Sequence, residues 1–367
     1  MTIEDLALYF TKGIGSRGAA HLVEHFGTAE RLFSASKEEL TYGAGLRSEL
    51  AERILAGEGM REAEREIKYC QKHDIRIISA TDEEYPEPLR ATVDRPHILF
   101  VLGEVSALSK QTLAMVGTRE ISPSGIHSAN ILIKDLSEEV ADLCIVSGLA
   151  YGADSACHRA ALANGVTTVA IIPSTLPSIT PTSHEQLAKD KLKAGGAIVS
   201  ELSSQTRNNG SHFISRNRII AGMSLATLVV ESPAKGGSLS TADIADSYSR
   251  TVLALPGRIT DTNSFGTNNL IRSGKARLVL TADDIIEDAG LQRSTKEQTT
   301  TTGNKEEVAL TESERKIIDA FKQSSILDWS ELLASTGLSM GELAMVMMDL
   351  EFKGAIRTLP GKRYEVI

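Results

Sequence analysis

Short apolar runs alternate with helix-length segments between residues 97 and 290, and this alternation is the feature that most constrains the fold. The intervening segments, at 124–139, 154–163, 184–194 and 238–250, have helical periodicity and capping residues. Strands that are apolar throughout are typical of a parallel sheet covered by helices on both faces. The sequence therefore predicts an α/β fold with a Rossmann-like, doubly wound parallel sheet. The expected strands lie at residues 113–117, 143–147, 168–172, 197–200, 225–231, 252–255 and 277–280.

The rest of the chain divides around this core, which we place at residues 81–291. Residues 1–80 predict a helical domain of the helix-hairpin-helix or SAM-like kind, with Gly-x-Gly turns at 13–15 and 43–45. These turns could bring the backbone close to a phosphate, or they could be plain turns between helices; the sequence leaves both interpretations open. Residues 292–307 are polar and predict a flexible linker. Residues 308–367 predict a winged helix of three helices and a hairpin.

Composition limits the classes of function. The 367 residues are 41% hydrophobic and 24% charged, as in soluble globular proteins. No signal peptide or apolar run long enough for a membrane helix is seen, so we expect a cytoplasmic protein without a membrane span. The three cysteines show no metal-ligand spacing, and Cys144 in an apolar run predicts a reduced core residue. No metal or cofactor site is predicted.

The net charge of −9 argues against a chain that binds polyanions over its whole surface, so nucleic-acid affinity would need a local basic patch. The winged-helix segment is itself acidic, and its third helix, expected at 339–352, contains no Lys or Arg. A helix that reads DNA needs side chains that reach phosphates or base edges. We therefore expect the winged helix to contact protein, and its removal to leave strand binding nearly intact.

Three loops that follow apolar runs carry residues suited to an anion. The first ends in Gly117, Thr118 and Arg119, and the second begins with Ser147 and Gly148. The third region combines Phe213, Arg216, Asn217 and Arg218 just before an apolar helix. Guanidinium groups and free helix N–H groups both attract phosphate. We expect these loops to form a phosphate-binding face at the carboxyl ends of the strands.

A fourth loop contains Lys235, Gly236, Gly237 and Ser238 at the start of a helix. Lys235 could reach a phosphate, or the loop could be a plain strand-to-helix connection. The usual motifs for NAD and ATP, G-x-G-x-x-G and GxxxxGK[ST], are missing. In the second loop, Asp154 could cap the next helix or pair with His158 one turn further on.

Taken together and in order, these motifs resemble the DNA-processing protein A (DprA or Smf) family of bacterial recombination mediators. The resemblance covers most of the chain and is densest at 85–275. Pieces that carry it include Tyr85-Pro86, Val116-Gly-Thr-Arg119, Ser147-Gly-Leu-Ala, Arg216-Asn-Arg-Ile-Ile-Ala-Gly222, Gly237-Ser-Leu, Arg250, Pro256-Gly257 and Gly266-x-Asn268. The sequence departs from the family pattern in the loop at 173–184, at Gly236 and at Lys275. The resemblance implies that this loop borders the binding pocket.

The resemblance implies a non-enzymatic protein that binds single-stranded DNA, forms a homodimer and loads the RecA recombinase onto strands held by single-strand-binding protein. It implies a role in natural transformation and recombination. The site implied by the loops and the resemblance comprises Gly117, Thr118, Arg119, Ser147, Gly148, Phe213, Arg216, Asn217, Arg218, Lys235, Gly236, Gly237 and Ser238. Arginine and lysine would contact the DNA backbone, whereas Asn217 and Phe213 could contact a base.

Two other functions stay open at this point. A phosphoribohydrolase-like enzyme would use the glycine-rich turn as a phosphate loop, with Asp243 where such enzymes have a catalytic glutamate, and Leu239 where they have a glycine. Cleavage of a glycosidic bond would need a positioned carboxylate and a closed nucleoside pocket. The other alternative is a module that senses mononucleotides and has no DNA role.

Overall fold

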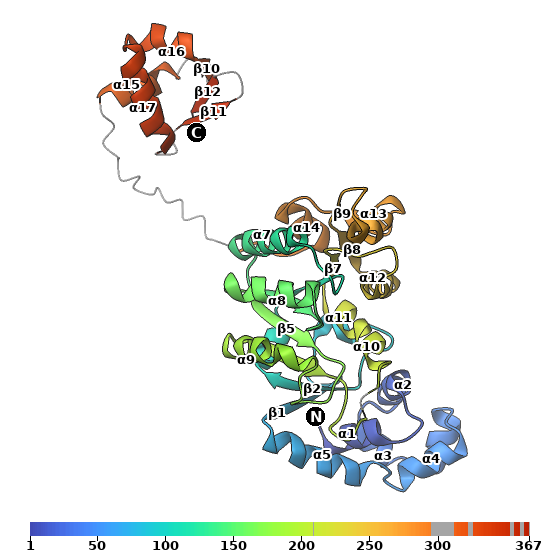
Figure 1. Cartoon of the computed structure of the whole chain (residues 1–367). Helices are drawn as coiled ribbons and strands as arrows, with labels where there is room; N and C mark the ends of the chain where they lie inside the picture. The colour runs from blue at the N-terminus through green and yellow to red at the C-terminus, as the bar shows by residue number, and fades with distance from the viewer. Residues whose placement is uncertain (208, 295–311, 322–325, 353–355, 360–362, 367) are drawn as a thin grey trace. The chain divides into compact units, whose positions relative to one another are not determined.

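The computed structural model describes residues 1–207, 209–294, 312–321, 326–352, 356–359 and 363–366. The chain forms two compact units, residues 1–294 and 295–367, and each is considered by itself. In the first unit, helices flank a long central sheet (Figure 1). Within the described residues, no helix is long and apolar enough to cross a membrane.

The sheet has nine strands in the order β1-β2-β6-β5-β4-β3-β7-β8-β9. Every neighbouring pair from β6 to β9 is parallel, whereas β1 and β2 add an antiparallel edge. From β3 the chain builds outward through β4, β5 and β6, then returns to place β7 on the other side of β3. This reversal makes the β3–β7 boundary a topological switch point, where doubly wound proteins bind ligands. The strands are β1 (Ile75–Ser79), β2 (Ile98–Gly103), β3 (Gln111–Val116), β4 (Leu143–Ser147), β5 (Thr167–Ile171), β6 (Ala197–Ser200), β7 (Ala226–Val229), β8 (Thr251–Ala254) and β9 (Arg277–Leu278).

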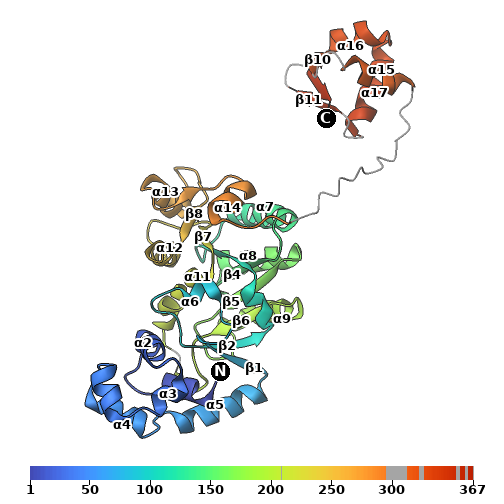
Figure 2. The ribbon, with the colours of Figure 1, turned by 180° about the vertical axis from the view of Figure 1, so that it is seen from behind.

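Helices cover both faces of this sheet, and the view from behind shows the same layers (Figures 1 and 2). The first face packs against α6, α11, α12 and α13, and the second against α7, α8 and α14. The bounds are α6 (Glu87–Arg90), α7 (Pro123–Glu139), α8 (Ala153–Ala163), α9 (Glu185–Lys193), α10 (His212–Ser215), α11 (Asn217–Met223), α12 (Gly237–Ser247), α13 (Phe265–Arg272) and α14 (Ala282–Ala289).

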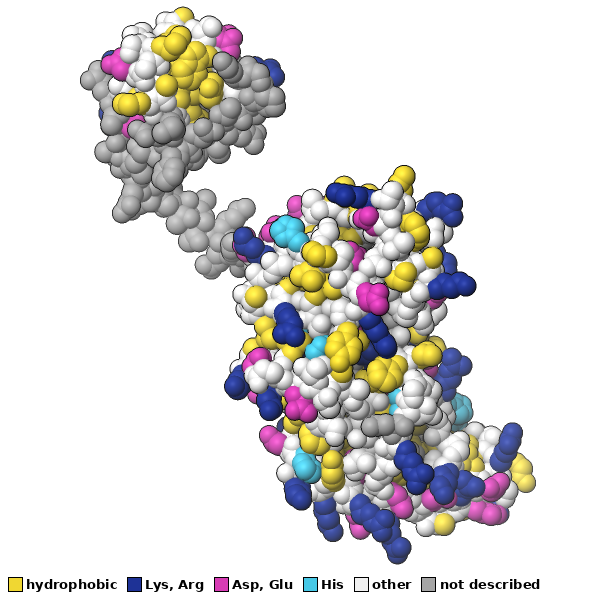
Figure 3. All heavy atoms as spheres, in the orientation of Figure 1, with side chains coloured by type: hydrophobic (Ala, Val, Ile, Leu, Met, Phe, Trp, Pro, Cys, Tyr) yellow, Lys and Arg dark blue, Asp and Glu magenta, His cyan; other side chains and the backbone are white. Residues whose placement is uncertain are grey.

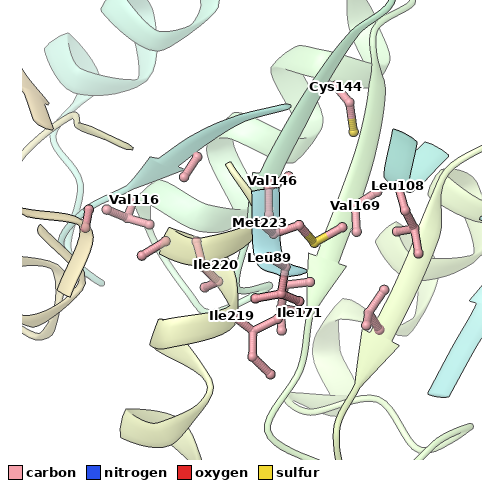
Figure 4. Close-up of a cluster of buried hydrophobic side chains, with 14 of the residues drawn as sticks. Leu89, Leu108, Val116, Cys144, Val146, Val169, Ile171, Ile219, Ile220 and Met223 are labelled. Carbon is pink, nitrogen blue, oxygen red and sulfur yellow. The ribbon is translucent and has the colours of Figure 1, made fainter. Parts of the chain in front are cut away.

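The core on the first face is built mainly from small and β-branched side chains. Val146 and Val169 from neighbouring strands meet Ile219 and Met223 of α11, all fully buried (Figure 4). Cys144 lies in the same cluster, as predicted, and burial raises the pKa of its thiol to about 12. Because α11 packs on the sheet, its position determines where the residues just before it lie relative to the carboxyl ends of the strands.

The N-terminal helices are α1 (Ile3–Phe10), α2 (Ser16–Phe26), α3 (Ala29–Phe33), α4 (Ser48–Leu55) and α5 (Met60–Lys72). Leu8, Leu22, Leu32 and Ile54 join in a core of their own. A further cluster joins α1 and α5 to β1, β2 and α9, so these helices also pack on the antiparallel edge of the sheet.

The parallel α/β class predicted from the sequence is confirmed, and β4 and β6 have the predicted bounds. The sequence prediction omitted β1 and β2, because α6, the helix between them, has only four residues and does not give the helix-length spacing of the other strands. The proposed boundary at residue 80 therefore falls just after an edge strand of the sheet.

The start of the linker predicted at 292–307 differs in the structure. Gln292 and Ser294 donate backbone hydrogen bonds to Gln111 and Glu139, and Arg293 forms ion pairs with Glu139 and Asp283. Residues 292–294 are thus attached to the core, because polar side chains of α7 and α14 offer partners that a sequence pattern does not reveal. The remainder of that prediction lies outside the described residues.

The second unit contains α15 (Glu312–Ala320), α16 (Trp329–Thr336) and α17 (Met340–Phe352) with a three-stranded sheet. Its strands are β10 (Ile326–Asp328), β11 (Ile356–Leu359) and β12 (Arg363–Val366). Ile317, Leu332, Leu343 and Leu350 form its core. The three helices and the hairpin agree with the predicted winged helix, and β10 is an additional strand.

Candidate nucleic-acid interface

A pocket of about 410 Å³ lies at the switch point, beyond the carboxyl ends of β3 and β7. We call it the basic pocket. Ten of the thirteen predicted site residues line it: Gly117, Thr118, Arg119, Phe213, Arg216, Asn217, Lys235, Gly236, Gly237 and Ser238. These residues come from the loop after β3, from α10 and the start of α11, and from the loop before α12, so the fold gathers three segments that are separate in the sequence.

The first loop is held by backbone hydrogen bonds on both sides. The Thr118 N–H donates to the Glu231 carbonyl at 2.8 Å, and the Ala153 N–H donates to the Thr118 carbonyl at 3.0 Å. Gly117 is required by this close packing, since a Cβ there would stand 2.6 Å from the Cβ of Ala153. The loop therefore projects Arg119 from a fixed base.

Arg119 and Lys235 are exposed cations on the rim of the basic pocket. The Arg119 guanidinium lies 5.8 Å from the centroid of the half-exposed Phe213 ring, a cation–π contact. Lys235 precedes α12, whose N-cap, Gly236, makes no side-chain capping hydrogen bond. The rim thus combines two exposed positive charges, an aromatic face and the N-terminus of a helix, all of which suit a phosphate and an adjoining base.

Arg216 belongs to the floor of the basic pocket together with Asp154, and both are buried. Its Nη1 donates to the carbonyls of Gly148, at 2.5 Å, and Ile171. Burial lowers the pKa of Arg216, although the negative charge of Asp154 opposes this shift. The guanidinium so nearly touches the backbone that a Cβ at Gly148 would stand 2.0 Å from Nη1. Arg216 therefore stabilises the loop after β4, which contains Gly148.

Three predicted site residues lie away from the pocket lining. The Ser147 hydroxyl is buried and donates to the Met115 carbonyl at 2.6 Å. Gly148 lies under the Arg216 guanidinium. Arg218 forms an ion pair with Glu201 and lines a neighbouring cavity. Arg216 and Arg218 are two positions apart, about 200° around a helix, so their side chains point to different sides, and Arg216 lines the basic pocket whereas Arg218 does not.

The lining also includes residues that the sequence prediction omitted, notably Glu120, Asp154 and Ile214. Asp154 does not pair with His158: it accepts a hydrogen bond from the Ala150 N–H at 3.2 Å, and Gly152 is the N-cap of α8. His158 is fully buried and its Nδ1 lies 2.6 Å from the Thr168 hydroxyl. Nothing in the local sequence distinguishes these partners, because Thr168 comes from the next strand.

The loop that departs from the family pattern packs beside the basic pocket. His184 Nδ1 lies 2.9 Å from the Leu149 carbonyl, and the Tyr151 hydroxyl lies 2.9 Å from that of Ser183. The His184 and Tyr151 rings meet edge to face at 5.0 Å. Since Ala150 lines the pocket between Leu149 and Tyr151, these contacts fix this wall of the pocket.

The comparisons with known proteins bear on this site. The family model described as DNA recombination-mediator protein A matches residues 76–290, and one described as the DprA winged helix domain matches 304–362. The chain belongs to the DNA recombination-mediator protein A family. Protein Smf of Escherichia coli strain K12 is 34% identical over 306 residues, 82% of this chain and 80% of that protein. The resemblance predicted from the sequence is confirmed.

Two solved structures of this family are similar to the chain. DNA processing protein A from Streptococcus pneumoniae has a TM-score of 0.67 and 29% identity, over 78% of this chain and 98% of that one. DNA processing protein A from Helicobacter pylori, described for its unique single-stranded DNA binding mode, has a TM-score of 0.51 and 26% identity, over 58% and 94%.

Proposed function

We propose that this protein is a cytoplasmic, non-enzymatic recombination mediator that binds single-stranded DNA in the basic pocket. The single observation that carries the proposal is the position of Arg119, Phe213 and Lys235 around one cavity at the switch point of the sheet. Cations for the backbone and an aromatic face for a base are what a sequence-tolerant single-strand site requires. The single-strand binding described for the Helicobacter pylori protein supports the same assignment.

The charge distribution supports a local site. Lys and Arg side chains are mixed with Asp and Glu over the visible face, and no broad basic surface is seen there (Figure 3). The basic pocket itself contains Arg119, Arg216 and Lys235 against Glu120 and Asp154. Because this excess is small, only a few phosphates would be neutralised, so affinity would depend mainly on the two exposed cations and the salt slope would be shallow.

The test is a titration of the full-length protein with a labelled oligothymidylate and with duplex DNA of equal length, at several salt concentrations. We expect the single strand to bind more tightly, with a log–log salt slope of about −0.7 for each phosphate neutralised. Equal affinity for the duplex, or a mononucleotide as the tighter ligand, would contradict the proposal and favour another class of binding protein.

The position of Asp243 argues against the phosphoribohydrolase alternative. Asp243 is exposed, pairs with Lys275 at 2.9 Å and does not line the basic pocket. A carboxylate held on the surface by a lysine is badly placed to assist glycosidic cleavage. We therefore expect no release of free base when the protein is incubated with nucleoside monophosphates. Steady turnover that Asp243→Asn abolishes would make the protein an enzyme.

We propose further that the protein acts as a homodimer in natural transformation, loading RecA onto strands that single-strand-binding protein holds. Membership of a recombination-mediator family supports this role. The winged helix is the part we assign to protein contact, since α17 contains no Lys or Arg. Strand exchange by RecA on DNA pre-coated with single-strand-binding protein should accelerate when the full-length protein is added, and unchanged exchange would contradict the loading role.

A further inference from the structure

A second cavity, of about 620 Å³, shares a wall with the basic pocket. Ile214 of α10 lines both cavities, so a chain leaving the first would cross this side chain to enter the second. Three arginines line the second cavity: Arg17 from α2, Arg218 from α11 and Arg250 just after α12. We call it the arginine pocket. It joins the N-terminal helices to the sheet-covering helices within one compact unit.

The arginines of this pocket have donor capacity left within the described protein. Arg218 pairs with Glu201, but its buried Nη1 has no hydrogen-bond partner. Arg250 donates from Nη2 to the Pro88 carbonyl at 2.8 Å, while its buried Nε has no partner. Unpaired buried donors are costly unless an acceptor is supplied. These two nitrogens are closed to solvent, so the attraction of the pocket for an anion would come from the guanidinium charges rather than from these donors.

Arg17 adds an exposed charge at the start of α2. It follows the Gly13-Ile14-Gly15 turn, and Gly15, the N-cap of α2, makes no side-chain capping hydrogen bond. The first-turn N–H groups of this 11-residue helix are thus free of a side-chain cap beside the guanidinium. Gly15 and Ser16 line a separate cavity, so this turn contributes to the arginine pocket through the Arg17 side chain alone.

The remaining lining suits a nucleotide better than a free inorganic anion. Val93 and Ile214 are 65% and 67% exposed at the pocket, and the Tyr248 ring also contributes to the lining. The one carboxylate in the lining, Asp94, accepts a hydrogen bond from the Tyr248 hydroxyl. Exposed apolar side chains beside guanidinium groups can contact a base while the cations contact its phosphate.

We infer that the arginine pocket is a second subsite for the same single strand, reached from the basic pocket across Ile214. This inference rests on the proposed function, since it extends the strand that the basic pocket would hold. It assigns Arg17, and with it the N-terminal helices, to DNA backbone contact.

The experiment measures affinity for a series of oligothymidylates of increasing length, using the full-length protein and its Arg17→Ala, Arg17→Lys and Arg119→Ala variants. Arg61→Ala is the matched control, because Arg61 is an exposed arginine of α5 that lines neither pocket. We expect wild-type affinity to rise with length until both pockets are filled. Arg17→Ala should bind the shortest oligomers normally and the longer ones about threefold more weakly. Its salt slope on long oligomers should be smaller by about 0.7.

The outcomes separate the two hypotheses. If Arg17→Ala, like Arg61→Ala, matches the wild type at every length while Arg119→Ala binds weakly, the second subsite is wrong and the proposed function stands. If neither Arg17→Ala nor Arg119→Ala weakens binding, the proposed function itself fails. Arg17→Lys should retain most of the affinity, because it keeps the positive charge; an equal loss in Arg17→Lys and Arg17→Ala would contradict a backbone contact.

Discussion

The rim and the floor of the basic pocket use the same residue type for opposite purposes. Arg119 on the rim is exposed, and its guanidinium lies over the Phe213 ring, so its charge is available to a ligand. Arg216 on the floor is buried, and its Nη1 donates to two backbone carbonyls. The comparison shows that an arginine in a binding motif can either contact the ligand or stabilise the backbone of the site. Its burial decides which of these roles it has.

The largest expected effect tests the floor. Arg216→Ala would leave the carbonyls of Gly148 and Ile171 without this donor, and each buried unsatisfied group costs about 1–3 kcal/mol. We expect the free energy of unfolding to fall by about 3 kcal/mol, measured by urea denaturation. Arg119→Ala in the same assay should change it by less than about 0.5 kcal/mol. If the two variants were equally stable, the distinction between rim and floor would not hold.

The rim is tested by DNA affinity. Arg119→Ala should fold normally and bind oligothymidylate about tenfold more weakly, a loss of about 1.4 kcal/mol. The loss should be similar for oligonucleotides of other sequences, and the salt slope should shrink by about 0.7, because a phosphate contact carries no sequence information. Unchanged affinity and slope in the folded variant would exclude Arg119 from the interface.

A third prediction concerns pH and the buried groups beside the floor. Burial lowers the pKa of His158 well below its ordinary value, and the charges of Lys191 and Arg216 lower it further. The unfolded chain therefore binds a proton below about pH 6.5 that the folded chain does not, so stability is lost as pH falls. Between pH 7 and 5.5 the loss from this one group should be about 1.2 kcal/mol.

The control is His158→Gln, which removes the titrating group. Its stability should depend less on pH over this range than that of the wild type, whereas substitution of the exposed His127 should leave the wild-type pH dependence in place. His97 also has a lowered pKa, caused mainly by burial, so some acid sensitivity should persist in His158→Gln. Parallel pH profiles for the wild type and His158→Gln would contradict the burial of a neutral imidazole.

The smallest expected effect concerns the second unit. Truncation after Ser294 removes the winged helix but keeps the residues attached to Gln111 and Glu139. Because the basic pocket lies wholly in residues 1–294, single-strand affinity should change by less than about twofold, or roughly 0.4 kcal/mol. If the truncated protein still unfolds cooperatively but its single-strand affinity falls more than tenfold, the winged helix contacts DNA and the prediction is wrong.

The alternating apolar runs were enough to predict the parallel sheet, because buried strands and their covering helices each need a local pattern of apolar residues. The glycine-rich and arginine-rich loops were also visible, since their residue types follow from what phosphate requires. The edge strands β1 and β2 could not be predicted in this way. β1 and β2 pair with each other across the four-residue helix α6, which gives no strand–helix alternation, and β2 joins the rest of the sheet through the distant strand β6.

The sequence by itself therefore determined the fold class, the family and the segments that supply the basic pocket. Only the tertiary structure decided where neighbouring side chains of one segment lie. Asn217 lines the basic pocket, Arg216 is buried in its floor, and Arg218 pairs with Glu201 and lines the arginine pocket. The physical reason is that burial and the direction of a side chain depend on how α11 packs on the sheet. Those contacts join residues far apart in the chain, so they cannot be predicted from a local sequence pattern.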